Sequence, residues 1–146
     1  YDERPAMRAI EIAEAAAARI REGGAGFVLM NFANGDMVGH SGIFSAAVEA
    51  CEAVDRAIGI VLEAAQEMGF ATLITADHGN SEEMIELESE EPITAHSTNP
   101  VPFILVDDDF SGKTIREGAG LRDIAPTVLK IIGLKIPEEM DGEPLV

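Results

Sequence analysis

The chain contains three histidines, and each of them stands in a polar loop beside groups that bind metal ions. His40 follows Asp36 by four positions, His78 directly follows Asp77, and His96 lies in a third loop. Imidazole nitrogens and carboxylate oxygens without a thiolate suit Mn²⁺, Zn²⁺, Co²⁺ or Mg²⁺ better than an iron–sulfur cluster or a structural zinc ion. These residue types therefore predict a site for divalent cations.

Each of these residues also has a structural alternative in which it binds no ligand. A lone histidine is commonly exposed or hydrogen-bonded, the pair Asp77-His78 could form a turn, and Asp36 could organise its loop as an Asx turn. Together these alternatives require three loops, distant in the sequence, to meet by coincidence. The shared position of all three histidines in the polar loops therefore favours the cation site.

Apolar segments next to these loops indicate the elements that position them. Residues 26–31 and 70–75 are typical of strands buried on both faces, and residues 102–106 form a third such segment. The apolar periodicity predicts helices over residues 7–20, 44–68 and 123–132, the last capped by Asp123. Strands alternating with helices predict an α/β fold with a parallel sheet and helices on both faces. Ligands bind such sheets beyond the carboxyl ends of the strands, where the polar loops are expected.

Composition excludes several classes of partner. The 146 residues include 10 Lys and Arg against 27 Asp and Glu, giving a formal net charge of −17. Such acidity argues against binding to nucleic acid phosphates or to an anionic membrane surface. No segment reaches the roughly 18–20 consecutive apolar residues of a membrane-spanning helix. The single Cys51 excludes an internal disulfide, fits a cytoplasmic protein, and is expected to be buried on the apolar face of its helix.

Further polar residues near the histidines have open interpretations. Asn34 and Asn80 flank the motifs and could orient metal ligands through hydrogen bonds, although a turn-forming role fits them equally well. The acidic residues that precede Pro92 are interpreted as a solvated loop near the site; they are Glu82, Glu83, Glu86, Glu88, Glu90 and Glu91.

Three segments resemble the cofactor-independent (2,3-bisphosphoglycerate-independent) phosphoglycerate mutases of the alkaline phosphatase superfamily. The segments read NFANGDMVGHSG at 31–42, TADHGNSEEM at 75–84 and TAHSTNPVPFILV at 94–106. The resemblance extends to YDERPAM at the start and to LRDIAPTVLKIIGLKIPEEMDGEPL near the end, so it covers essentially the whole chain. It implies an alkaline-phosphatase-like α/β core that lacks its N-terminal section.

The resemblance also implies a set of metal ligands. Asp36, His40 and His96 would hold one cation, and Asp77 and His78 would supply part of the coordination of a second, most often manganese in this family. The remaining ligands in the family are an Asp near the N-terminus and the nucleophilic Ser, and neither has a counterpart here. The absence of a Met at Tyr1 fits a piece of a longer polypeptide. Residues 1–146 would then be the C-terminal portion of the phosphatase-like domain, without the phosphotransferase domain that binds phosphoglycerate.

For the parent protein, the resemblance implies an isomerase of glycolysis and gluconeogenesis. It would interconvert 3-phosphoglycerate and 2-phosphoglycerate through a phosphoserine intermediate at a dinuclear metal centre. In the family the nucleophile comes from a separate, earlier segment, so Ser41, Ser81 and Ser97 do not match it, and we expect this chain to be inactive alone. Its expected partners are the remaining segments of the parent chain, or a second copy bound through an exposed sheet edge. Two alternatives stay open: a metal-dependent phosphatase or sulfatase, and a non-catalytic metal-binding interaction module.

Overall fold

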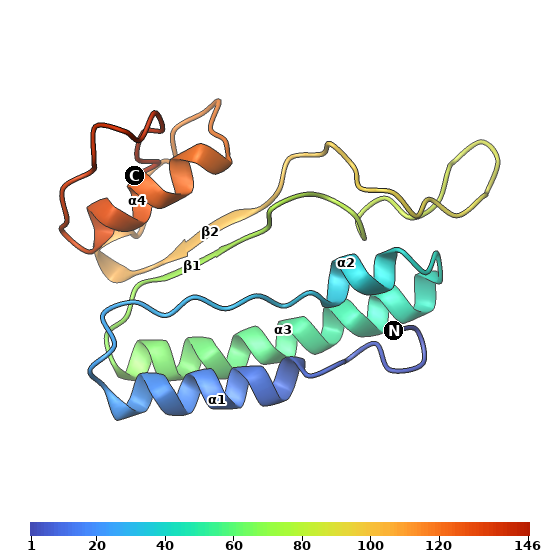
Figure 1. The fold of residues 1–146 in the computed structure, drawn as a ribbon, viewed down its shortest axis with the longest axis horizontal. Coiled ribbons are helices and arrows are strands. Elements are labelled where there is room, and N and C mark those ends of the chain that lie inside the picture. The colour runs from blue at the N-terminus through green and yellow to red at the C-terminus, as the bar shows by residue number, and fades with distance from the viewer. The chain divides into compact units, whose positions relative to one another are not determined.

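Two helices lie side by side and bury a stripe of small side chains between them (Figure 1). Helix α1 spans Ala9–Glu22 and helix α3 spans Phe44–Glu67. The buried residues of this cluster are Ala9, Ala13, Ala17, Ile20, Ala57, Val61 and Ala64. Alanine side chains are short, so the two helices approach each other closely. Both helices were predicted from apolar periodicity, and both are confirmed.

A larger side chain in the contact between α1 and α3 is expected to lower the stability of the fold. We predict that Ala13→Leu destabilises the chain by about 1–3 kcal/mol, because Ala13 is fully buried in the helix contact and the added atoms must displace its neighbours. Chemical denaturation followed by circular dichroism measures this change. Ala15→Leu, on the exposed side of the same helix, is the matched control. Equal stability of the two variants would contradict this account of the helix pair.

The computed structural model describes all residues from 1 to 146, and they form two compact units, Tyr1–Phe103 and Ile104–Val146. All the predicted metal-site residues belong to the first unit. No helix in either unit is both long enough and apolar enough to cross a bilayer. Cys51 is exposed and not buried as expected, because its neighbours Ala50 and Ala53 occupy the packed side of α3.

Residues 26–31, predicted as a buried strand, form no strand. The segment of residues 26–32 is extended and runs along the two helices (Figure 1), but its backbone makes no hydrogen bond. Alternate side chains, Val28, Met30 and Phe32, pack against the α1–α3 cluster, whereas Phe27 and Leu29 are 55% and 83% exposed. The apolar pattern of a strand is therefore present, but the chain offers the segment no neighbouring strand, and a strand exists only through its backbone partner.

The other two predicted strands do form. Strand β1 spans Thr72–Thr75, strand β2 spans Phe103–Val106, and they make a two-stranded sheet. The loop expected after residue 31 contains a short helix, α2, over Asn34–Gly39. Val38 of α2 is completely buried against Ala46, Ala47 and Ala50 of α3 and against Met84. This apolar anchor fixes α2, which sequence periodicity did not reveal because the helix is so short.

In the second unit, Asp123 ties two segments together. Helix α4 spans Ile124–Ile131, and two short 3₁₀ turns precede it, at Asp108–Phe110 and Leu121–Asp123. Asp123 occupies the N-cap position as predicted, but its side chain does not cap α4. The buried carboxylate instead accepts hydrogen bonds from the backbone N–H groups of Gly120 and Glu143, both at 2.8 Å, and pairs with Arg116 at 3.0 Å. It thus links the start of α4 to the C-terminal segment.

The hydrogen bonds from Glu143 and Gly120 lower the pKa of Asp123 below its ordinary value of 3.8. A carboxyl group with a lowered pKa in the folded state stabilises the protein above that ordinary value, and the contribution is lost as the pH falls through the folded-state pKa. We predict that Asp123→Asn lowers the unfolding midpoint at neutral pH and flattens its decline in acid. Thermal unfolding across this pH range tests the prediction, with the exposed Asp141→Asn as control. An acid profile identical to that of the unmodified chain would contradict it.

Candidate metal centre

Helix α2 places two of the predicted ligands on one face. Asp36 lies in the first turn of α2 and His40 follows its last residue, so the four-residue spacing directs both side chains the same way. Asn34 begins the helix, and its side-chain amide donates to the carbonyl oxygen of Pro5 at 2.9 Å. Asn34 therefore fixes the start of α2 and does not orient a metal ligand.

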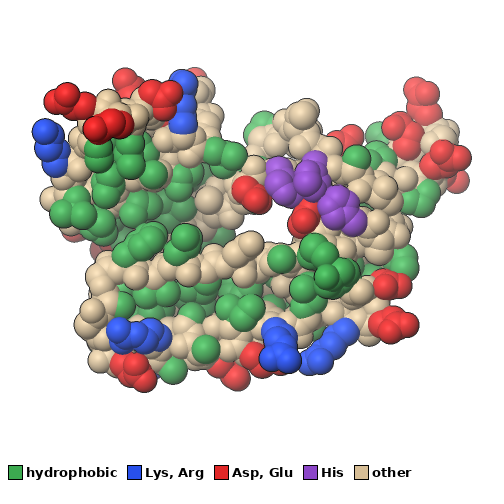
Figure 2. Space-filling view, viewed as in Figure 1, with side chains coloured by type: hydrophobic (Ala, Val, Ile, Leu, Met, Phe, Trp, Pro, Cys, Tyr) green, Lys and Arg blue, Asp and Glu red, His purple; other side chains and the backbone are tan.

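His96 comes from a distant loop and completes a compact group with Asp36 and His40. The Nε2 atoms of His40 and His96 are 3.1 Å apart, and they lie 3.2 Å and 3.0 Å from Oδ1 of Asp36. These three atoms have a geometry that could hold a metal ion. Figure 2 shows the three imidazoles of the chain gathered side by side on one face, with carboxylates next to them.

The hydrogen bond at the other side of the His40 ring identifies the atom that is free to bind a cation. Nδ1 of His40 lies 2.6 Å from the carbonyl oxygen of Thr94. A carbonyl only accepts hydrogen bonds, so Nδ1 carries the proton and the neutral ring has its lone pair on Nε2. That lone pair faces the Asp36 carboxylate, which is also an acceptor. Two acceptors at this distance require positive charge or a proton between them, and a divalent cation meets the requirement.

Asn80 holds Asp36 in place. The side-chain amide of this buried residue donates to Oδ1 of Asp36 at 2.9 Å, which is the ligand-orienting role considered for it from the sequence. Burial raises the pKa of Asp36, but the hydrogen bond from Asn80, with the positive charge that the neighbouring imidazoles carry when they are protonated, outweighs it, so the pKa is lowered from 3.8. Asp36 is therefore a carboxylate near neutral pH, as a metal ligand must be. A Cβ at Gly39 would overlap the Asn80 side chain, so only glycine fits there.

His78 and Asp77 occupy different positions relative to this group. The ring of His78 stacks on that of His96, with centroids 3.8 Å apart and planes inclined by 19°, and its Nε2 is 3.9 Å from Oδ1 of Asp36. The Asp77 side chain is 85% exposed and lies 3.8 Å from Nε2 of His78. The structure thus brings His78 to the edge of the group and leaves Asp77 outside it. A second cation held by Asp77 and His78 stays a prediction.

Each of the three serines near the histidines donates a hydrogen bond to another residue of the chain. Ser41 donates to the carbonyl oxygen of Val38 at 2.6 Å, and Ser81 donates to that of Gly35 at 2.5 Å. Ser97 donates to the carboxylate of Glu82. All three hydroxyl groups are thus already engaged as hydrogen-bond donors within the protein.

Glu82 is a residue whose role the sequence did not reveal. It was assigned to a solvated acidic loop, but its carboxylate accepts hydrogen bonds from Asn80, Ser97 and Asn99. The Ser97 hydroxyl is the main cause that lowers the pKa of Glu82, and it outweighs the effect of burial. The only sequence signal was its position two residues after Asn80, which does not distinguish it from the neighbouring glutamates.

The fold and the site together define an α/β protein with a cluster of histidine and aspartate side chains suited to divalent cations. Residues 1–136 match the family described as the metalloenzyme superfamily, and the chain belongs to this superfamily.

Within this superfamily, the chain is similar to proteins named as phosphoglycerate mutases. All 146 residues align at 49% identity with the 2,3-bisphosphoglycerate-independent phosphoglycerate mutase of Rhodopirellula baltica, covering 27% of that protein. Mutase 2 of Methanosarcina barkeri is also 49% identical over the whole chain, again with 27% of its length covered. The resemblance stated from the sequence motifs is thereby confirmed.

A solved structure supports the fold. The chain is similar to a Leishmania mexicana phosphoglycerate mutase, crystallised at low cobalt concentration, with a TM-score of 0.87 and 30% identity. The match covers 98% of this chain and 29% of the other, so the expected α/β fold is confirmed as the fold of one part of such an enzyme. The chain spans less than a third of the length of these relatives.

The central role of Asp36 in the group leads to a binding prediction. We expect Asp36→Asn to weaken Mn²⁺ binding roughly a hundredfold or more, beyond the about 10–100-fold typical of groups that only orient ligands. The amide keeps the size of the side chain but removes the anionic oxygen shared by His40 and His96. Isothermal titration calorimetry measures the affinity, and Asp55→Asn, on the exposed side of α3, removes the same charge elsewhere. Unchanged affinity in Asp36→Asn would place the cation elsewhere.

Proposed function

We propose that this chain is the metal-binding C-terminal portion of a cofactor-independent phosphoglycerate mutase. The observation that carries the proposal is the convergence of the Asp36, His40 and His96 ligand atoms within 4.8 Å of one another. The 49% identity to named mutases over every residue of the chain supports the choice of this reaction over a phosphatase or sulfatase. In the parent protein the reaction is the interconversion of 3-phosphoglycerate and 2-phosphoglycerate through a phosphoserine, as part of glycolysis and gluconeogenesis.

The bound ion in this proposal is Mn²⁺, with Zn²⁺, Co²⁺ and Mg²⁺ as alternatives that the same nitrogen and oxygen donors accept. When bound, divalent cations stabilise the negative charge of a phosphoryl group during its transfer. Hydrogen bonds within this chain orient the ligand atoms. Thr94 fixes the tautomer of His40, and Asn80 fixes the carboxylate of Asp36. The exposed Asp77 and its neighbour His78 supply part of a second cation site, which other segments of the parent protein complete.

The nucleophile and the substrate-binding groups come from outside these 146 residues. Ser41, Ser81 and Ser97 each donate a hydrogen bond to another residue of the chain, which argues against their use as the nucleophile. The remaining segments of the parent chain are therefore the proposed partner, with phosphoglycerate as the substrate of the assembled protein. The exposed side chains of Phe27 and Leu29, on a segment without a backbone partner, support such an association or a dimer. The acidic composition and single cysteine support a cytoplasmic location without nucleic acid or membrane partners.

A complementation experiment tests the proposed function. We expect the chain alone with Mn²⁺ to show no conversion of 3-phosphoglycerate to 2-phosphoglycerate, because it lacks a nucleophile. Co-refolding with the part of the Rhodopirellula baltica mutase that the chain does not match should produce activity, measured by coupling 2-phosphoglycerate to enolase.

The Asp36→Asn chain should fail to complement, which separates a metal-dependent assembly from a contaminating mutase. Activity of the chain by itself would refute its proposed dependence on other segments. Stoichiometric Mn²⁺ binding without any complementation would instead favour the non-catalytic metal-binding module.

A further inference from the structure

The carboxylate of Glu82 connects the two loops that carry His78 and His96. Its Oε2 accepts the backbone N–H of Asn80 at 2.7 Å, in the first loop. Its Oε1 accepts the hydroxyl of Ser97 and the side-chain amide of Asn99, the latter at 3.1 Å, both in the second loop. Asn99 also donates to the Glu83 carboxylate at 3.0 Å, and the Glu83 N–H donates to the carbonyl oxygen of Asn80 at 3.1 Å, but the Glu83 carboxylate accepts no hydrogen bond from the first loop. Glu82 is therefore the carboxylate that joins the two loops.

The backbone of the two loops meets at the same place. The N–H of Ser97 donates to the carbonyl oxygen of Gly79 at 2.9 Å, which forms an isolated bridge between the loops. A Cβ at Gly79 would overlap both the Ser97 hydroxyl and the Glu82 carboxylate, so the close approach depends on glycine. Gly79 directly follows His78, and Ser97 directly follows His96. The contact therefore acts on the residues adjacent to the two stacked imidazoles.

His96 depends on this loop contact more than His40 does. The His40 ring is oriented by its own hydrogen bond to Thr94. Nδ1 of His96 makes no hydrogen bond, and the polar and ring-stacking contacts of the ring are with Asp36, His40 and His78. Its position is thus set by the backbone that carries it, and Glu82 holds the Ser97 and Asn99 side chains on that backbone.

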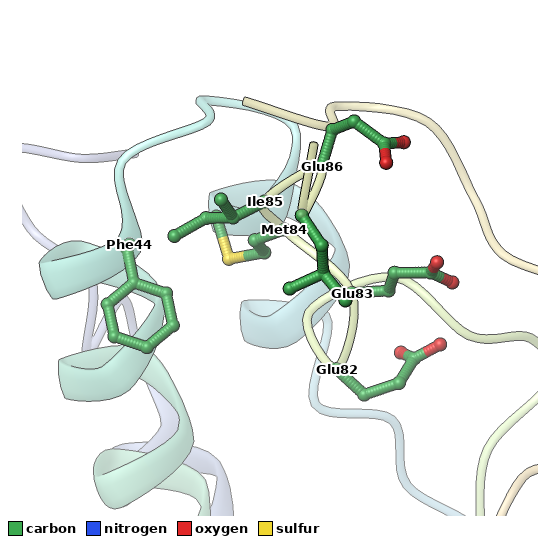
Figure 3. Close-up of a pocket in the computed structure, with 7 residues that line it drawn as sticks. Phe44, Glu82, Glu83, Met84, Ile85 and Glu86 are labelled. Carbon is green, nitrogen blue, oxygen red and sulfur yellow. The ribbon is translucent and has the colours of Figure 1, made fainter. Parts of the chain in front are cut away.

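The segment that bears Glu82 is itself anchored from the opposite side. Met84 is buried with Val38 of α2 and the alanines of α3. Figure 3 shows the side chains of Met84 and Ile85 turned toward Phe44 of α3, with the Glu82 and Glu83 carboxylates directed away from them. An apolar anchor on one side and a carboxylate on the other give the segment two fixed points.

We propose that Glu82 is a positioning residue of the metal centre, holding the His96 loop so that Nε2 of His96 faces Asp36 and His40. This inference rests on the metal site of the proposed function. It assigns a task to one member of an acidic segment in which Glu83 also accepts from Asn99, but only Glu82 accepts from both loops. Glu82 makes no hydrogen bond to the ligand atoms, and it acts through the Asn80 N–H and the side chains of Ser97 and Asn99.

The test compares Glu82→Gln with Glu86→Gln in the complete chain. The amide keeps the shape of Glu82 but replaces one accepting oxygen with an N–H₂ group, which cannot accept a hydrogen bond from the Asn80 N–H or the Asn99 amide. We expect Glu82→Gln to weaken Mn²⁺ binding by about tenfold, the lower end of the range for groups that orient ligands. Glu86→Gln removes the same charge from the same segment and should leave the affinity within about twofold of the original. Calorimetric titration measures both, and the electron paramagnetic resonance spectrum of bound Mn²⁺ reports any change in its ligand set.

A second pair of measurements separates positioning from general loss of stability. Ser97→Ala should weaken Mn²⁺ binding in the original chain but add little to Glu82→Gln, because both changes break the same link. Hydrogen exchange of the Ser97 amide, recorded without metal, should be faster in Glu82→Gln than in Glu86→Gln.

Equal Mn²⁺ affinity of the two glutamine variants would overturn the role of Glu82. If the unmodified chain binds no Mn²⁺ at all, the proposed metal site fails. The exchange of the Ser97 amide then decides about Glu82 by itself: unchanged protection refutes its hold on the loop, and faster exchange supports it.

Discussion

The arrangement of the site depends on the convergence of three side-chain atoms that can each bind a cation. The carboxylate of Asp36 and the Nε2 atoms of His40 and His96 lie about 3 Å from one another, and the His40 tautomer places a lone pair on its Nε2. Acceptors at this distance repel one another unless a proton or a cation lies between them. The surrounding contacts oppose that repulsion, because Thr94 holds one ring and Asn80 holds the carboxylate.

The scaffold beneath the site uses small residues to bring backbone segments close together. Alanines line the contact of α1 with α3, and Val38 seats the short helix α2 on α3 beside Met84. Gly39 and Gly79 allow Asn80 and Ser97 to approach where a Cβ would overlap their side chains. Because α2 packs closely on α3, the position of α3 fixes the positions of Asp36 and His40.

The segment of residues 26–32 shows how a sequence pattern and a structure can differ. Its apolar residues on both faces are typical of a strand covered on both sides. Within this chain one face packs on the helices, and the backbone bonds to nothing. Phe27 and Leu29 are left exposed on the other face. The sequence thus encodes a strand whose partner these 146 residues do not supply, in keeping with a chain that covers under a third of its relatives.

The sequence by itself determined the helices of residues 7–20 and 44–68, the strands within 70–75 and 102–106, and the five residues considered as metal ligands. These features are local, because apolar periodicity and residue type are properties of neighbouring positions. Tertiary structure decided which ligands meet: Asp36, His40 and His96 join, His78 stacks at their edge, and Asp77 turns outward. It also decided the tasks of Glu82 and Asp123, whose hydrogen-bond partners lie up to 20 residues away. Such pairings depend on how distant loops are brought together by the fold, and the apolar periodicity of a single segment does not predict this.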